Sequence, residues 1–219
     1  RDETPQPFTF TSYNGKATQN DLSTLTNYLI NTYGYDPGGY IDNTKELKSN
    51  KLLARLDWNI NESNKLMVRH SYTNNHSLSP SRSTNYAINF YNAGVNFPST
   101  TNSTTAELKT NHDNWSNSLM AVYTNVNDDR DPMGADFPYV QIRDGSGTIY
   151  LGSETYSAAN ALIQNSFDLT DNLTLYKGKH TITIGTSNEF ASVYNLYIRQ
   201  NFGQYYFNSL DDFYKSKAY

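Results

Sequence analysis

Residues 47–75 contain two stretches in which apolar and polar side chains alternate, joined by the short polar turn 61–64. In an extended strand, alternate side chains point to opposite faces, so each stretch has one apolar face and one charged face. In the first stretch the two faces hold Leu52, Ala54, Leu56, Trp58 and Ile60 against Lys51, Arg55, Asp57 and Asn59. In the second they hold Leu66, Val68 and Tyr72 against Lys65, Arg69, Ser71 and Thr73. The pattern predicts a β-hairpin whose two faces meet different surroundings.

Two kinds of protein explain such a hairpin. In a membrane-spanning β-barrel, strands of about ten residues present alternate side chains to lipid and to water. In a soluble all-β protein, the apolar side chains pack against a second sheet. Trp58 and Trp115 lie beside short polar segments, and Tyr176 precedes a third turn at 177–179. Aromatic residues at these strand ends favour the barrel, whose membrane boundaries carry such side chains, although they also suit the end of a sandwich core.

The later part of the chain repeats the alternation. The stretch 162–176 sets Ile163, Phe167, Leu169, Leu173 and Leu175 against Gln164, Ser166, Asp168, Thr170 and Thr174. The stretch 180–198 sets Ile182, Ile184, Phe190, Tyr194, Leu196 and Ile198 against Thr181, Thr183, Ser187, Glu189 and Asn195. Such a length exceeds the roughly five or six residues of an ordinary strand, which favours a barrel wall rising beyond the bilayer. Within 116–127, two sets compete for the apolar face: Leu119, Ala121 and Tyr123, or Met120, Val122 and Val126.

The composition excludes several other classes of protein. Hydrophobic residues make up only 37% of the 219 residues, and no window holds the ~18 consecutive apolar residues of a membrane-spanning helix. The requirement for a long apolar run does not apply to barrel strands, because only alternate residues of such a strand face lipid. The net charge of -4, with the 17 Lys and Arg residues scattered, argues against a nucleic-acid partner. The absence of cysteine excludes disulfides and thiolate metal sites.

Short turns and long polar segments alternate along the chain. We expect three strand hairpins and four long loops, the hairpins at 43–75, 104–127 and 161–198 and the loops at 1–42, 76–103, 128–160 and 199–219. The first loop contains a predicted helix, which Asp21 caps and Gly34 ends. The third contains a predicted small hairpin that turns at Asp144-Gly145.

These segments resemble a known family. Residues 176–213, the segment RLDWNINESNKLMVRHSY and the segment NDDRDP are similar to the barrel of TonB-dependent outer-membrane receptors from Bacteroidetes, most nearly the Oar-like receptors with a carboxypeptidase-regulatory-like domain. The similarity runs from about Asp42 to Phe213 and touches the ETPQPF start. It implies an all-β fold, an antiparallel transmembrane barrel of ~22 strands closed by a plug domain, to which this chain contributes about six strands. It also implies uptake of large nutrients across the bacterial cell outer membrane.

The resemblance further implies an orientation and a set of partners. Outer-membrane barrels have short periplasmic turns and long extracellular loops, so the turns near 61–64, 112–116 and 177–179 are expected in the periplasm. The expected partners are outer-membrane lipid, the plug domain of the same full-length chain, the TonB complex acting through that missing part, and a surface lipoprotein. Neither plug nor TonB box is recognisable, so energy coupling is not assigned to any residue of this sequence. The sequence starts without Met or a signal peptide and stops just after a short helical signal, so we expect a piece of a longer protein. Peptide or protein cargo is favoured, and glycans remain open.

Two sets of side chains are candidates for contact with a substrate or a plug. The first is the charges on the predicted water-facing side, able to pair across strands: Arg55, Asp57, Arg69, Asp168 and Glu189. A water-filled interior tolerates such charges without any specific role. The second is the loop aromatics, which either bind sugars and peptides or hold the loops together: Tyr86, Phe90, Tyr91, Phe97, Tyr205 and Tyr206.

Signatures of metal binding and catalysis are weak. The acidic residues Asp128, Asp129, Asp131 and Asp136 are a candidate for Ca²⁺, but no calcium-loop spacing is matched and a turn at Asp131-Pro132 is the better explanation. The four His residues lack metal-ligand spacing. A Gly-x-Ser-x-Gly elbow, a cysteine nucleophile and a phosphate-binding glycine loop are all missing from the sequence. We therefore expect neither a cofactor nor enzymatic activity.

The rival interpretation is a soluble or surface-anchored all-β module that binds carbohydrate or acts as an adhesin. It explains the richness in Tyr, Asn and Thr without a membrane. The surroundings of six apolar side chains separate the two interpretations: Leu52, Leu56, Leu66, Val68, Ile182 and Ile184. Packing against a second sheet supports the module, and exposure toward lipid supports the barrel. A third interpretation is that a piece with open strand edges adopts a non-native arrangement or exists only in a larger complex.

Overall fold

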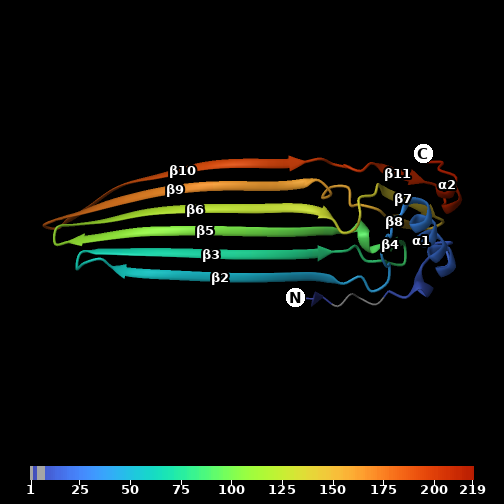
Figure 1. Cartoon of the computed structure of the whole chain (residues 1–219), viewed down its shortest axis with the longest axis horizontal. Helices are drawn as coiled ribbons and strands as arrows, with labels where there is room; N and C mark the ends of the chain where they lie inside the picture. Colours follow the sequence, from blue (N-terminus) through green and yellow to red (C-terminus); the bar gives the residue numbers. More distant parts are fainter. Residues whose placement is uncertain (1, 4–7) are drawn as a thin grey trace.

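The computed structural model describes residues 2, 3 and 8–219, and its main feature is a sheet of long antiparallel strands (Figure 1). The long strands are β2 (Lys45–Asn59), β3 (Asn64–Ser79), β5 (Val95–His112), β6 (Trp115–Pro132), β9 (Asn160–Lys177) and β10 (His180–Tyr197). A short strand, β1 (Asp2–Glu3), pairs with the start of β2. The strand order is β1-β2-β3-β5-β6-β9-β10, so each long strand pairs with the next long strand along the chain. The expectation of an antiparallel, mostly β fold is confirmed.

Short turns join the long strands in pairs at one end of the sheet (Figure 1). Between β2 and β3, the Asn61 Oδ1 accepts hydrogen bonds from the backbone N–H groups of Ser63 at 3.0 Å and Asn64 at 2.9 Å. Between β9 and β10, Gly178 has a φ of 61°, a left-handed conformation that glycine adopts without steric cost. These turns, with the one between β5 and β6, lie where the sequence predicts them.

The strand register assigns each side chain to a face, because residues directly opposite each other in a sheet share a face. In β2 and β3, Leu56 lies opposite Val68, and Arg55 lies opposite Arg69. The separation of apolar and charged residues in this hairpin is therefore confirmed. We call the side with Leu56 the apolar face and the side with Arg55 the polar face.

The register also decides the orientation of β6. Leu119 lies opposite Leu108, and Tyr123 lies opposite Phe167, so both belong to the apolar face. Met120 lies opposite Glu107 and belongs to the polar face. Within β6 both faces carry apolar side chains, so its own sequence does not show which face is the apolar one. Only the residues opposite them in β5 and β9 assign the two faces.

Three long strands extend further than the sequence predicts. β3 continues to Ser79, β5 begins at Val95 and β6 continues to Pro132, so the expected loops 76–103 and 128–160 shrink to 80–94 and 133–159. Their Ser-, Thr- and Asn-rich ends pair within the sheet through polar side chains. Asn74 donates to the Thr100 Oγ1 at 3.0 Å, and the His76 Nε2 and Asn96 Oδ1 lie 2.7 Å apart.

The segments at the other end of the sheet fold together into a compact cap, made of residues 8–44, 80–94, 133–159 and 198–219 (Figure 1). Its helices are η1 (Phe10–Ser12), α1 (Gln19–Tyr33), η2 (Tyr91–Ala93) and α2 (Leu210–Tyr214). Its strands are β4 (Ala87–Asn89), β7 (Tyr139–Asp144), β8 (Gly147–Leu151) and β11 (Gln204–Phe207), in the order β11-β7-β8-β4. The predicted hairpin at Asp144-Gly145 is confirmed as β7 and β8.

The hydrophobic core of the described part of the chain lies in this cap rather than along the long sheet. Helix α1 packs onto the small sheet, and the buried side chains include Leu22, Leu25, Leu29, Ile88, Phe90, Ile142, Ile149 and Leu151. The N-cap of α1 is Thr18, not Asp21 as the sequence suggested. Asp21 is the third helical residue, and its carboxylate accepts from the Thr18 N–H at 2.8 Å in a capping box. Gly34 ends the helix as predicted.

Residues 1 and 4–7 of the expected first loop, with most of the ETPQPF segment, lie outside the described residues. Among the described residues, none of the helices is long and apolar enough to cross a membrane.

Candidate functional site at the cap and on the polar face

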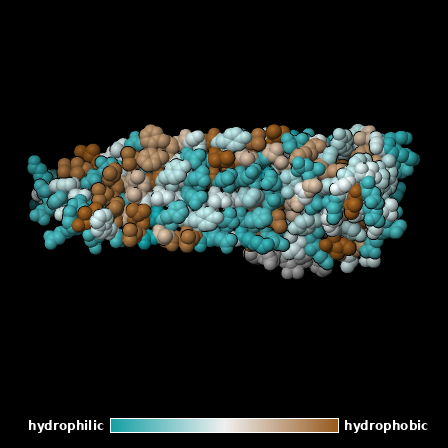
Figure 2. Space-filling view, in the orientation of Figure 1, coloured by the Kyte–Doolittle hydropathy of each residue, from teal (hydrophilic) through white to brown (hydrophobic). Residues whose placement is uncertain are grey.

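On β6 the apolar face is confined to the part of the strand near the short turns, whereas on β9 and β10 apolar residues continue toward the cap, where Ile163 lies opposite Tyr194. Along β6, this face runs from Trp115 through Leu119 to Tyr123, and then continues toward the cap as Asn125 and Asn127. Figure 2 shows hydrophobic side chains gathered toward the turns and mostly hydrophilic ones over the middle of the strands. The stretch from Trp115 to Tyr123 matches the roughly 9–11 residues with which a tilted strand crosses a bilayer.

Hydrogen bonds lie at the end of the apolar stretch of β6 that is nearer the cap. The Tyr123 Oη donates to the Asn165 Oδ1 at 3.0 Å, and the Asn125 side chain donates to the same oxygen at 2.8 Å. The ring of Tyr123 thus stands with the apolar side chains while its hydroxyl joins the polar ones. This arrangement is typical of an aromatic residue at a membrane–water boundary.

The aromatic residues near the short turns divide between the two faces. Trp58 lies opposite Leu66, and Trp115 lies opposite Leu175, so both Trp side chains belong to the apolar face. Tyr176, which the sequence grouped with them, lies on the polar face because it is one residue out of phase with Leu175. Its hydroxyl is 3.1 Å from the Ser116 Oγ. The expectation for Tyr176 is therefore wrong.

The five charges singled out in the sequence all lie on the polar face. Arg55, Arg69, Asp168 and Glu189 fall in one row that crosses the sheet through Thr105 and Val122. The row is cationic at β2 and β3 and anionic at β9 and β10. Asp57 pairs with Arg55 of its own strand, through two contacts of 2.7 Å, rather than across strands. Both side chains of this pair are more than half exposed, so the pair contributes little to stability.

The loop aromatics singled out in the sequence do not form one cluster. Phe90 is fully buried in the cap core and Phe97 lies in β5 under the guanidinium of Arg130, so neither is a side chain of an open loop. Tyr91 lies in η2, and burial raises its pKa. Tyr86 is 63% exposed. Tyr205 and Tyr206 lie on β11, and Tyr205 lines a pocket in the cap.

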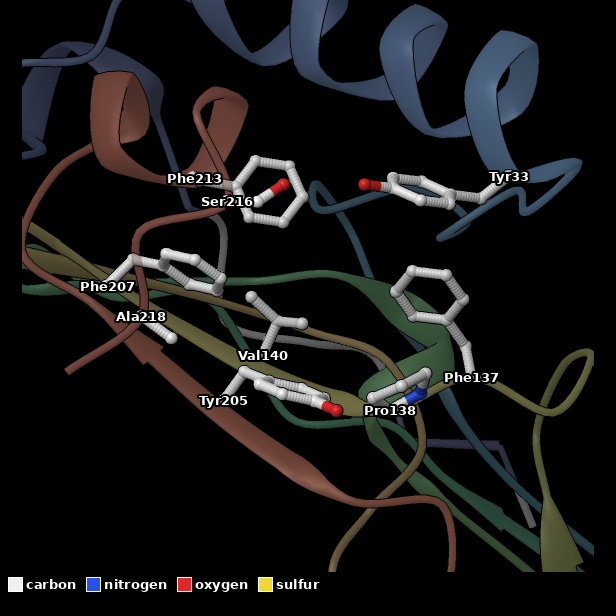
Figure 3. Close-up of a pocket in the computed structure, with 9 residues that line it drawn as sticks. All are labelled: Tyr33, Phe137, Pro138, Val140, Tyr205, Phe207, Phe213, Ser216 and Ala218. Carbon is white, nitrogen blue, oxygen red and sulfur yellow. The ribbon is translucent and has the colours of Figure 1, made fainter.

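That pocket, of about 350 Å³, lies in the cap between α1, β7, β11 and α2 (Figure 3). Its lining residues are Tyr33, Phe137, Pro138, Val140, Tyr205, Phe207, Phe213, Ser216 and Ala218. The sequence identified only Tyr205, because the other residues come from separate segments with no shared motif. The acidic segment at 128–136 does not assemble in a comparable way, and the described residues contain no group of three acidic or His side chains able to hold a metal ion.

The comparisons with known proteins agree with this geometry. Residues 3–216 match the family model described as an outer membrane beta barrel domain. None of the curated proteins matches the chain. The match covers nearly the whole chain and includes all of the long strands and most of the cap. The chain therefore belongs to the outer membrane beta barrel domain family, which places it in the bacterial outer membrane.

Proposed function

We propose that this chain forms part of the wall and the external cap of a transmembrane barrel that takes up a large nutrient, as TonB-dependent receptors do. One observation carries the proposal. The long strands expose apolar side chains on one face, over about the height of a bilayer, and charges on the other. Leu56 is 67% exposed and Ile184 is 64% exposed. Apolar surface of this extent is stable where hydrocarbon covers it.

The strand lengths support an orientation for this barrel. β5 has 18 residues, which reach roughly 60 Å at about 3.3 Å per residue. A tilted strand needs only about half of those residues to cross the hydrocarbon. In the proposed arrangement the short turns face the periplasm, the half of each strand next to the cap rises above the outer surface, and the cap stands outside the cell.

The cap and the polar face have different roles in the proposed uptake. The cap meets the substrate first, and the polar face lines the water-filled path that the substrate takes. The row from Arg55 to Glu189 faces that path, where a plug domain of the full-length protein would meet it. The TonB complex supplies energy through that plug, and a surface lipoprotein delivers cargo to the cap. The chain binds and conducts its substrate without catalysing a reaction.

The second candidate, a soluble or surface-anchored carbohydrate-binding module or adhesin, draws support from the polar, Tyr-rich cap. It requires the apolar face to pack against a second sheet. The small sheet of the cap buries its own core instead, and Leu52 remains 64% exposed. The barrel is therefore the better explanation.

Uptake by living cells tests the proposal. A strain that lacks the gene is compared with the parent strain for accumulation of fluorescent peptide and oligosaccharide mixtures, each with and without a functional TonB complex. We expect the deletion to reduce accumulation of one mixture, and loss of the TonB complex to reduce it equally. Unchanged accumulation of both mixtures would contradict uptake, and a deletion effect that ignores the TonB complex would contradict energy coupling.

A further inference from the structure

The cap pocket is lined mainly by apolar side chains. None of the lining residues carries a charge, and six of them have wholly apolar side chains: Phe137, Pro138, Val140, Phe207, Phe213 and Ala218. The polar side-chain groups among the lining residues are the hydroxyls of Tyr33, Tyr205 and Ser216. A ligand for such a pocket is neutral and largely apolar, because a buried charge without a partner is strongly unfavourable.

The walls of the pocket are held in place by the core of the cap. Val140, Phe207 and Phe213 line the pocket and are almost fully buried. The rings of Phe207 and Phe213 meet edge to face with centroids 5.1 Å apart. On the other side, Phe137 stacks on the buried Tyr35 at 4.0 Å. A pocket built from packed core residues exists before the ligand arrives, so little binding energy is lost to rearrangement.

Two half-exposed aromatic residues line the pocket from opposite sides. Tyr33, at the end of α1, and Tyr205, on β11, are each 49% exposed. In Figure 3 the labelled side chains surround a common space, with Tyr33 and Phe137 on one side and Phe207 and Ala218 on the other. Aromatic walls favour an aromatic guest, since rings gain from stacked and edge-to-face contacts beyond the area that they bury.

We propose that this pocket binds a single neutral aromatic ring, carried either by a peptide side chain or by a free aromatic molecule. At about 350 Å³, the pocket is near the lower end of the size range of ligand sites, so it accommodates one ring-bearing group rather than a whole large substrate. A sugar fits poorly, because only three side-chain hydroxyls line the pocket, and most of the sugar's own hydroxyls would be buried without hydrogen-bond partners. The proposal relies on the proposed uptake function only for the ring's role in capture, not for binding itself.

Calorimetry on the intact protein in lipid nanodiscs tests the proposal with three probes: p-cresol, N-acetyl-tyrosinamide and methyl glucoside. Ala218→Trp places a large side chain in the pocket without removing any core residue, and Lys217→Trp adds the same side chain at an exposed neighbour outside the lining. We expect at least one aromatic probe to bind saturably, and Ala218→Trp to weaken binding roughly tenfold while Lys217→Trp leaves it unchanged.

The probes also identify the source of the ring. Tighter binding of N-acetyl-tyrosinamide indicates a peptide side chain, and tighter binding of p-cresol indicates a free aromatic molecule. The proposal is overturned if neither aromatic probe binds, if methyl glucoside binds more tightly than both, or if the two Trp variants bind alike. Because calorimetry needs no transport, its outcome is separate from the uptake experiment, and each proposal can fail without the other.

Discussion

Asp171 is a carboxylate on the apolar face, between Leu119 of β6 and Thr186 of β10. The Asn117 side chain donates to its Oδ1 at 2.7 Å. On the lipid side of a barrel, an acidic residue costs less than Lys or Arg, and a hydrogen bond to the carboxylate lowers that cost further. The neighbouring amide therefore explains how the apolar face accommodates a charge at this position.

A basic residue placed elsewhere on the apolar face has no such hydrogen-bond partner, which gives a test of the two faces. In Val68→Arg, the guanidinium enters the apolar stretch of β3 between Leu56 and Ala106, with no carboxylate directly opposite, and we expect the barrel to lose about 2–4 kcal/mol of stability. Met67→Arg is the matched control, because Met67 lies on the polar face of the same strand, opposite Asp57 and Glu107. Urea unfolding of the intact protein in lipid measures both. Equal tolerance of the two substitutions would mean that the faces are wrongly assigned.

Tyr13 and Asp144 fasten the first segment of the cap to the β7–β8 hairpin. The Tyr13 hydroxyl donates to the Asp144 Oδ2 at 2.9 Å, and the Ala17 N–H donates to the same oxygen at 2.9 Å. Burial, and then the negative charge of Asp144, hold the pKa of Tyr13 above its ordinary value. The contact therefore stabilises the cap while the phenol is protonated. That contribution is complete below the ordinary tyrosine pKa of about 10 and is lost as the pH rises toward the folded-state value.

The expected result is a loss of cap stability in alkali that depends partly on Tyr13. Tyr13→Phe lowers stability at pH 8 by removing the hydrogen bond, typically worth about 1 kcal/mol. Between pH 8 and about pH 11, past the ordinary tyrosine pKa, it also loses less stability than the parent. Urea unfolding followed by the near-ultraviolet circular dichroism of tyrosine measures both changes. Tyr86→Phe, at an exposed position of the same cap, serves as the control. A parallel decline in Tyr13→Phe and the parent would rule out the role given to this contact.

At the scale of elements, helix α1 ends at a glycine whose only constraint is its backbone conformation. Gly34 has a φ of 65°, and a Cβ added there would meet nothing within 4 Å. Gly34→Ala therefore costs roughly 1 kcal/mol through backbone strain alone. Gly39→Ala is the control, since that Cβ also meets open space and the residue is not left-handed. Hydrogen exchange of the α1 peptide should increase only in Gly34→Ala, and an equal increase in both variants would contradict the argument.

The elements differ in how far the sequence predicts them. Alternation predicts the faces of β2, β3, β9 and β10, because lipid and water act on neighbouring residues of one strand. It fails at the polar ends of β3 and β5, where His76 and Pro98 pair across the sheet although both belong to the loop expected at 76–103. It fails more completely for the cap core and its pocket, since Tyr33 and Phe213 are brought together only by the fold. Amphipathic alternation is local information, whereas the pocket depends on contacts between distant segments.

At the scale of the whole molecule, the two edges of the long sheet are open in the described part of the chain. β10 ends the sheet on one side, and β2 is covered on the other only where it pairs with β1. In hydrocarbon, an unpaired backbone N–H or C=O group costs several kcal/mol, so a stable spanning sheet has no free edges. We therefore expect further strands of the same barrel to pair with both edges in the membrane.

The orientation of the molecule gives the last prediction. The chain contains no cysteine, so maleimide labelling of a single introduced thiol, compared with labelling of the parent strain, shows where that residue lies. In Tyr86→Cys the thiol lies on the exposed surface of the cap, and in Glu62→Cys it lies in an exposed short turn at the far end of the strands. With a maleimide that cannot cross the outer membrane, we expect intact cells to label Tyr86→Cys alone, and permeabilised cells to label both. Labelling of Glu62→Cys in intact cells, with Tyr86→Cys protected, would place the cap in the periplasm. Because the capture of external cargo requires the cap to be outside, that outcome would remove the basis for uptake as well as for the orientation.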